Sequence, residues 1–423
     1  MPKDSRAGLG NISQGREPRL VMESDINLLR FLARIFLSDD EFRDIHSHGR
    51  NCLATLLIMA AMLEFRTRGF NPYAVKYSPY YDNRVAVAAA ANFGIVGCGR
   101  VFALGLTAAG IQVEKTFDTN DALYDLAWSE INEDQLLVAC GDGSIKLFDI
   151  GVDTYPVMNY HEHKRETFSV FWNQTAKDTF ISSSWDGTVK IWSPTRTESL
   201  RTLPIGSCTY SVAFSPHNPA LISAVSSDSR LRIFDLRTPV SAKYHLIADI
   251  PVHQTPAHRN RLLAAPPPAI VEEQPLPPPQ PAEILTHDWN KYAPSGLIAT
   301  AGVDRFIRTF DLRAPYNGPL ALMAGHEYAV RRLAWSPHAS DVLVSASYDM
   351  TVRVWSDGSA MGPVDDAATA AGVRAGRQLG LMNRHTEFAT GVDWCLFGAG
   401  GWVASTGWDE RVLLWDANSL LRR

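Results

Sequence analysis

Residues 184–192 read Ser-Trp-Asp-Gly-Thr-Val-Lys-Ile-Trp, and this stretch decides the fold. An Asp-Gly pair between two apolar runs is typical of the tight turn of a β-hairpin. After that turn, Val189 and Ile191 alternate with Lys190, which is the period of two expected of a strand that buries one face. The stretch therefore predicts two short antiparallel strands, the second of which ends at Trp192.

The same pattern recurs along the chain of 423 residues. In each copy an aromatic residue closes the strand after the turn, and these residues are Phe148, Trp192, Phe234, Phe310, Trp355 and Trp415. Most intervals between them are close to the roughly 40–45 residues of a WD40 repeat, and the two longest contain insertions. A degenerate seventh copy lies between Tyr73 and Leu106.

One repeat of this kind forms a small sheet that cannot bury both of its faces, so neighbouring repeats must stack. Seven four-stranded sheets close into a ring that leaves only short, protected edges. The sequence therefore predicts an all-β fold, a seven-bladed WD40 β-propeller with a non-propeller N-terminal extension.

The limits of the propeller are expected at residues 62–416, with a short tail at 417–423. The last repeat closes at Trp415 and leaves too few residues for a fourth strand, so the alternating stretch Met62–Thr67 is predicted to complete the last blade. Residues 1–61 then lie outside the ring. Two interpretations of them stay open: a helical or disordered extension, or a misassigned reading frame whose true start is Met62.

Two insertions interrupt the repeats. Residues 255–282 are rich in proline, a composition that favours polyproline II and cannot form a packed core. Residues 358–375 are rich in alanine and glycine. We expect both to be solvated loops, and the alternative for the first is a ligand of an SH3-like domain. The proline-rich loop precedes the first strand of the fifth blade.

Charge and cysteine content limit the classes of partner. The formal net charge of -5 gives no electrostatic reason to expect nucleic acid. Five cysteines, an odd number scattered along the chain, indicate a reducing compartment. No uncharged apolar run reaches the roughly 18 residues that span a bilayer. We expect a cytoplasmic protein with no membrane span.

Histidine, hydroxyl and aspartate residues recur in a way that could suggest a hydrolase. We predict three such sets, each with a closing tryptophan: His326, Ser347, Asp349 and Trp355; His385, Thr406, Asp409 and Trp415; and His163 (or His161), Ser184, Asp186 and Trp192. The same set in three blades indicates architecture, because a buried aspartate needs hydrogen-bond partners. No His/Cys cluster has metal-ligand spacing. We expect no enzyme activity, no metal and no cofactor.

The loops before the first strand and between the second and third strands of each blade line one face of a propeller. At these positions the sequence places the aromatic residues Tyr73, Tyr124, Phe168, Trp185, Tyr210, Tyr348, Phe388 and Trp408. Acidic neighbours are Asp121, Glu166, Glu283 and Glu387, and Arg331 is the basic exception. Aromatic and carboxylate groups together favour a basic, amphipathic helix or peptide as ligand. The alternative is that several of these side chains only fill contacts between blades.

Several stretches are more specific than a WD40 repeat: Phe65-Arg66-Thr67, Asn92-Phe93-Gly94-Ile95-Val96-Gly97, Asp121-Ala122-Leu123-Tyr124-Asp125-Leu126-Ala127-Trp128, Glu283-Ile284-Leu285, Tyr328-Ala329-Val330-Arg331-Arg332 and His385-Thr386-Glu387-Phe388. With them the chain resembles the peroxisomal import receptors for the type-2 targeting signal, a family of WD40 peroxins, over about Met62 to Asp416. Residues 1–61 and the proline-rich loop depart from the family pattern.

The resemblance implies a cytoplasmic receptor that cycles to the peroxisome, to its membrane or matrix. Such a receptor binds an N-terminal nonapeptide of cargo proteins, with Arg or Lys near its start and His or Gln near its end. It delivers the cargo with a peroxin coreceptor to a docking complex of the peroxisomal membrane. The alternative is a generic WD40 scaffold or substrate adaptor that binds peptides or histones.

Overall fold

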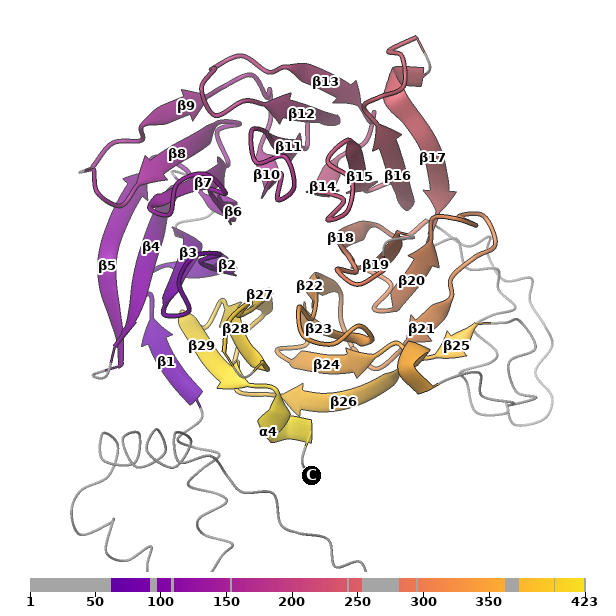
Figure 1. Ribbon diagram of the computed structural model, residues 1–423. Helices are drawn as coiled ribbons and strands as arrows, with labels where there is room; N and C mark the ends of the chain where they lie inside the picture. Colours follow the sequence, from indigo (N-terminus) through magenta and orange to yellow (C-terminus); the bar gives the residue numbers. More distant parts are fainter. Residues whose placement is uncertain are drawn as a thin grey trace, which may run out of the picture. The chain divides into compact units, whose positions relative to one another are not determined.

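The computed structural model describes residues 62–91, 97–107, 110–152, 154–241, 243–252, 281–293, 296–361, 373–398 and 400–421. The predicted N-terminal extension, residues 92–96 and most of the two insertions lie outside these residues. The described chain forms seven small sheets arranged in a ring (Figure 1). The prediction of an all-β, seven-bladed propeller is confirmed.

Blades one to four are each built from consecutive strands. Blade one contains β2 (Asn71–Tyr77), β3 (Arg84–Ala91), β4 (Cys98–Thr107) and β5 (Gly110–Thr119). Blade two contains β6 (Leu123–Trp128), β7 (Gln135–Cys140), β8 (Ile145–Asp149) and β9 (Met158–Tyr160). Blade three contains β10 (Thr167–Trp172), β11 (Phe180–Ser184), β12 (Thr188–Trp192) and β13 (Arg201–Pro204). Blade four contains β14 (Thr209–Phe214), β15 (Leu221–Ser226), β16 (Arg230–Asp235) and β17 (Leu246–Pro251), with the short helix η1 (Lys243–His245) before β17.

Blades five to seven include strands that are not consecutive. Blade five contains β18 (Ile284–Trp289), β19 (Leu297–Gly302), β20 (Ile307–Asp311) and β21 (Ala321–Met323), and the two-residue strand β25 (Arg374–Ala375) adds to it in parallel. Blade six contains β22 (Val330–Trp335), β23 (Val342–Ser347), β24 (Val352–Ser356) and β26 (Arg377–Met382), with η3 (Ser359–Met361) after β24. Blade seven contains β27 (Ala389–Trp394), β28 (Trp402–Gly407), β29 (Arg411–Asp416) and β1 (Met62–Arg66). The chain then forms α4 (Asn418–Leu421), and no helix in the described part is long and apolar enough to cross a bilayer.

Ring closure joins the two ends of the propeller. Strand β1 pairs antiparallel with β29, so that Met62 lies opposite Trp415 and Arg66 opposite Arg411. The backbone continues this pairing, because Thr67 N–H donates to the Glu410 carbonyl at 2.9 Å. Blade seven thus takes its outer strand from the start of the ring, as the alternation of Met62–Thr67 predicts (Figure 1).

The core lies between neighbouring blades as layers of apolar side chains. Between blades three and four, for example, Ile181 and Ile191 pack with Val212, Phe214 and their neighbours. A single blade would expose these faces, and each fully buried side chain of this size stabilises the fold by about 1.5–3 kcal/mol. The sheets therefore depend on one another for stability.

The histidine networks lie inside the blades. In blade six, Asp349 Oδ2 is 2.8 Å from His326 Nδ1, and His326 Nε2 is 2.7 Å from Ser345 Oγ, which accepts from Trp355 Nε1–H at 2.8 Å. The chain of bonds is satisfied when Nδ1 carries the proton and Ser345 donates to Nε2. Blades three and seven repeat it through Ser182 and Ser405.

The prediction was wrong about which hydroxyl residue belongs to each network. Ser184, Ser347 and Thr406 are not the bridging residues. Trp355 pairs with Leu343, so the nearest hydroxyl on the same face of the sheet is Ser345. Ser347 ends the strand instead, and its Oγ accepts from the Asp349 N–H of the turn at 3.1 Å. Thr406 follows Ser405 and points to the other face of its strand.

Electrostatics explain why the networks are structural. Burial acts to raise the pKa of the Asp349 carboxyl, but hydrogen bonds from His326, Thr351 and the Glu327 backbone hold that pKa well below its usual range. Burial also lowers the pKa of His326, which keeps the ring neutral at pH 7. An ionised, fully bonded aspartate beside a neutral histidine holds the turn in place.

We expect Phe65→Ala to destabilise the ring closure. Phe65 of β1 packs edge-to-face on Phe102 of blade one, with ring centroids 5.9 Å apart, so its loss removes part of the contact that joins blades seven and one. The half-buried side chain implies a loss of about 2 kcal/mol in the free energy of unfolding, measured by urea denaturation. The exposed neighbour Glu64→Ala is the control and should change it by less than about 0.5 kcal/mol. Equal effects of the two substitutions would contradict the assigned closure.

Asp349→Ala should lower the free energy of unfolding at pH 7 by about 2–3 kcal/mol, because His326 and two backbone N–H groups lose their acceptor. The folded-state pKa of Asp349 is depressed, so its stabilisation is present above about pH 4 and fades as the pH falls below that. The variant should therefore show a shallower loss of stability in acid than the parent. The exposed Asp178→Ala is the control and should leave both measurements unchanged.

Candidate peptide-binding site

Each innermost strand begins with a β-bulge at the same repeat position. The register shifts once near the start of β2, β6, β10, β14, β18, β22 and β27. The seven bulge residues are Tyr73, Tyr124, Phe168, Tyr210, Leu285, Arg331 and Thr390. A bulge leaves one residue unpaired and re-aims its side chain. Because the seven strands run in the same direction around the axis, these residues gather at one end of the central channel.

Eight aromatic side chains at this end form a continuous series, which we call the aromatic arc. Successive ring centroids are 4.9–6.1 Å apart in the order Tyr210, Trp185, Phe168, Tyr124, Tyr73, Trp408, Phe388, Tyr348. The arc contains stacked pairs, such as Tyr124 on Phe168 at 4.9 Å, and edge-to-face pairs, such as Tyr73 against Tyr124 at 5.4 Å. All eight aromatic residues predicted from the sequence therefore lie together, in rigid mutual contact.

Three tyrosines of the arc, Tyr73, Tyr124 and Tyr210, have a raised pKa and remain neutral donors. Burial raises the pKa of Tyr73, with further contributions from Tyr124 and Tyr348. Burial also raises the pKa of Tyr210, whose hydroxyl donates to Glu283 Oε2 at 3.0 Å. The arc thus offers flat apolar surface together with hydroxyl groups, a combination that suits peptide recognition.

Three of the four predicted carboxylates adjoin the arc. Glu283 accepts the Tyr210 hydroxyl, and both Glu166 and Asp121 act to raise the pKa of Tyr124 through their negative charge, after burial. Glu387 is exposed, and no hydrogen bond or ion pair links it to another described residue. The arc is therefore bordered by negative charge on blades two, three and five.

The position of the Asp121 carboxylate depends on two neighbouring glycines. A Cβ atom at Gly97 would lie 2.7 Å from Asp121 Oδ1, and one at Gly141 would lie 2.9 Å from it. Real Cβ atoms do not approach an oxygen so closely, so a side chain at either position would displace the Asp121 carboxylate. Gly97 belongs to the stretch that the family resemblance singles out, and its absent side chain makes room for the carboxylate.

Arg331 is the exception in the site, as the sequence predicts. It is the bulge residue of blade six, only 2% of its surface is exposed, and its guanidinium carbon lies 4.7 Å from the ring centre of Phe168 in blade three. Burial lowers the pKa of Arg331. The side chain therefore reaches across the channel and ends against the arc on the opposite side.

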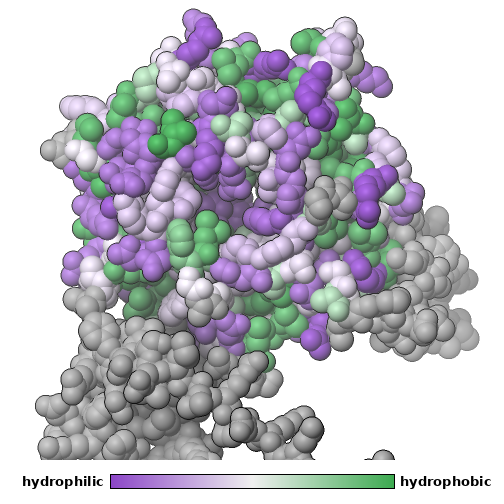
Figure 2. Space-filling model, viewed as in Figure 1, coloured by the Kyte–Doolittle hydropathy of each residue, from purple (hydrophilic) through white to green (hydrophobic). Residues whose placement is uncertain are grey.

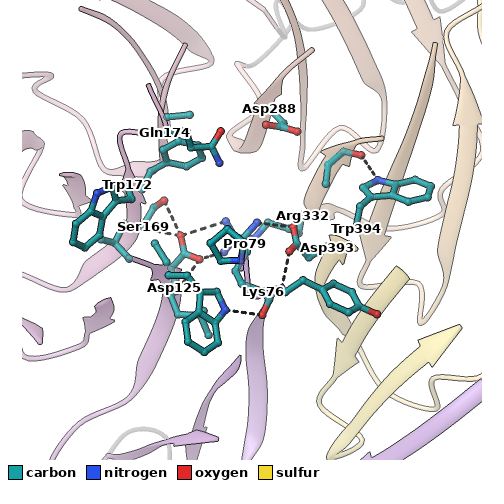
Figure 3. A pocket seen from close by; sticks show the side chains of 18 of the residues that line it. Lys76, Pro79, Asp125, Ser169, Trp172, Gln174, Asp288, Arg332, Asp393 and Trp394 are labelled. Carbon is teal, nitrogen blue, oxygen red and sulfur yellow. Dashed lines mark hydrogen bonds and ion pairs between the residues drawn. The ribbon is translucent and has the colours of Figure 1, made fainter. Parts of the chain in front are cut away.

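The rest of the channel contains charged side chains that pair with one another. A cavity of about 150 Å³ is lined by residues further along the innermost strands and by the loops that follow them. Figure 3 shows Arg332 extending across it to Asp125, which also accepts from Ser169 Oγ at 2.8 Å. Lys76 Nζ pairs with Asp393 Oδ1 at 2.9 Å in the same way. Paired charges leave this cavity less suited to an anchor than the aromatic arc.

Figure 2 presents one face of the molecule, in the view of Figure 1. Figure 2 shows mainly hydrophilic residues around the central hollow of that face, with hydrophobic residues in separate patches. Among the described residues no group of three or more His, Cys, Asp or Glu side chains could hold a metal ion.

Sequence reasoning missed some residues of the channel. Leu285 and Thr390 occupy bulge positions but are neither aromatic nor charged, so composition gave no signal. Arg165, whose guanidinium lies 5.7 Å from the ring centre of Trp185, and the Asp125–Arg332 pair were also missed. Aligning the seven innermost strands residue by residue would have placed Leu285 and Thr390 on the channel.

Comparisons with known proteins agree with this fold and extend it. The family described as "WD domain, G-beta repeat" matches residues 155–193, 198–235 and 317–356. The chain is 37% identical over 402 residues to the "Peroxisomal targeting signal 2 receptor" of Saccharomyces cerevisiae, covering 84% of this chain and 99% of that protein. It is 37% identical over 360 residues to the Mus musculus protein of the same name, covering 85% and 98%. It is 38% identical over 351 residues to the Arabidopsis thaliana "Peroxisome biogenesis protein 7", covering 82% and 95%.

The ion pair between Asp125 and Arg332 should couple the effects of substituting these two residues on the free energy of unfolding. Arg332→Met should cost about 3 kcal/mol of unfolding free energy, because the buried Asp125 carboxylate would lose its cationic partner and keep only neutral donors, the Ser169 hydroxyl and the N–H groups of Leu126 and Val170. Asp125→Ala should cost a similar amount, and the double variant should cost clearly less than the two together, by about 1–3 kcal/mol. The exposed Arg313→Met, which loses its partner Asp311, is the control and should show no measurable change. Strict additivity in urea denaturation would contradict the pairing.

Proposed function

The chain belongs to the family of peroxisomal targeting signal 2 receptors, and from this premise we propose that it binds the N-terminal type-2 targeting signal of cargo proteins on the aromatic arc. The observation that carries the proposal is the arc itself, eight aromatic side chains in unbroken contact with carboxylates along their border.

The geometry suits a short amphipathic helix with a basic start. Apolar side chains on one face of such a helix would pack on the arc, as anchors spaced three or four residues apart do in helix-in-groove recognition. The N-terminal end of a helix carries partial positive charge, which adds to that of an Arg or Lys near the start of the signal. Asp121, Glu166 and Glu283 offer carboxylates to this end, and Glu387 extends the acidic rim.

The delivery steps complete the proposal. The receptor would collect folded cargo in the cytoplasm, associate with a peroxin coreceptor, and bring the cargo to the docking complex of the peroxisomal membrane for import into the matrix. It would work without enzyme activity or cofactor, because the histidine–aspartate sets have a structural role in each blade. A generic WD40 scaffold or substrate adaptor is the second candidate, and no single observation favours it over the receptor.

Binding of a nine-residue signal peptide tests the role of the carboxylates. We compare two peptides, one with arginine near its start and one with neutral citrulline at that position, by fluorescence anisotropy. The parent protein should bind the arginine peptide about 5–10-fold more tightly, the value of one charge-assisted pair. Glu166→Gln should remove most of this difference, whereas Glu198→Gln, an exposed residue in the loop between β12 and β13, should preserve it.

Two results would contradict the proposal. If the parent protein does not bind the arginine peptide, the chain is not a receptor for this signal. If it binds both peptides equally, a basic residue is not recognised and the scaffold alternative is favoured.

A further inference from the structure

The Arg331 guanidinium lies among aromatic residues of the arc. We call five of them the aromatic cage: Phe168, whose ring centre is 4.7 Å from the guanidinium carbon, and Tyr73, Tyr124, Tyr210 and Tyr348, whose hydroxyl groups are near enough to interact electrostatically with the Arg331 charge. Aromatic faces carry negative potential and attract cations such as quaternary ammonium groups. In this protein the cation belongs to the chain itself.

We propose that Arg331 is a built-in occupant of this cage, which excludes the basic residue of the cargo signal from the centre of the site and confines its recognition to the carboxylates on the rim. The inference deepens the proposed function and rests on it. It assigns Arg331 as a specificity-determining residue, since it fixes where on the face the positive end of a bound peptide can lie.

The burial of Arg331 shows that the cage is closed to an outside cation. Only 2% of the residue is exposed, and Nη2 has no hydrogen-bond partner among the described residues. None of the ion pairs between described residues includes Arg331, and the nearby Asp125 is held by Arg332 and Ser169. The face of Phe168 and the negative charge of the nearby Asp125 therefore compensate the desolvated charge of Arg331.

The residue type fits this task. A guanidinium is planar, stacks on aromatic rings and stays charged at all physiological pH values, whereas a lysine ammonium loses its proton more readily when buried. The bulge at the start of β22 aims Arg331 into the channel, and its length lets it span from blade six to Phe168 in blade three. A second cation could not occupy the same place, because the guanidinium already fills the space and would repel it by like charge.

Tetramethylammonium tests the occupancy of the cage without any signal peptide, with intrinsic tryptophan fluorescence as the readout, because Trp185 and Trp408 belong to the arc. The parent protein should show no saturable change beyond that caused by the same concentration of sodium chloride. Arg331→Met, which keeps the stem of the side chain and vacates the head, should show a saturable change. Arg313→Met, which removes an exposed guanidinium that does not belong to the arc, should respond as the parent does.

The arginine and citrulline peptides then test whether Arg331 excludes the basic residue of the signal from the cage. In Glu166→Gln the preference for the arginine peptide should fall to about 2-fold or less. The peptide arginine then lacks its main carboxylate partner on the rim, and Arg331 still occupies the cage. In Glu166→Gln/Arg331→Met the preference should return to about 5-fold, because the open cage accepts the arginine. Thermal unfolding of each variant shows that it is folded before binding is measured.

Two outcomes would overturn the inference: saturable tetramethylammonium binding by the parent protein, or an arginine preference that stays at its low value in the double variant. If Arg331→Met does not fold, the titration of the parent protein still decides whether the cage is open. Failure of the proposed function is a separate result, because the parent protein would then bind neither peptide while the tetramethylammonium titrations kept their expected outcome.

Discussion

Closure of the ring is the constraint on which the rest of the structure depends. Every blade buries its faces only against its neighbours, so the apolar layers between blades exist only if the first and last blades also meet. Strand β1 makes this possible by pairing with β29 along its whole length. With the ring closed, seven innermost strands run side by side in one direction, and equivalent positions of distant repeats come to the same end of the channel.

The bulges turn this regularity into a binding surface. In a regular strand, the side chain at each of these positions would project from one face of the sheet toward a neighbouring blade. The extra residue of a bulge is unpaired, and its side chain is re-aimed to the channel end. Four of the blades place Tyr or Phe at the bulge. Aromatic residues from three turns between the second and third strands of a blade, and from one loop before a first strand, extend the series into the aromatic arc. Recognition therefore uses positions that the fold repeats, with side chains that differ from blade to blade.

Arg331 and Arg332 show two ways to hold a buried positive charge. They are consecutive in β22, yet the bulge sends Arg331 to the aromatic cage and Arg332 to the carboxylate of Asp125. The Arg332 ion pair compensates desolvation by direct Coulomb attraction and hydrogen bonds, whereas Arg331 has no ion pair and packs its guanidinium against the ring of Phe168. The ion pair supports the channel, and the guanidinium of Arg331 lies within the site.

The sequence by itself determined the propeller, its seven blades, the closing strand Met62–Arg66 and the aromatic and acidic residues of one face, because a repeat period, strand alternation and turn residues are local properties of the chain. It placed His326, Asp349 and Trp355 in one network but chose Ser347 over Ser345, since the bridging hydroxyl depends on strand register. Only the tertiary structure decided that the eight aromatic residues touch in one arc, that Asp125 pairs with Arg332, and that Arg331 ends against Phe168. These contacts join blades far apart in the sequence, and they follow from the direction of side chains in a closed ring.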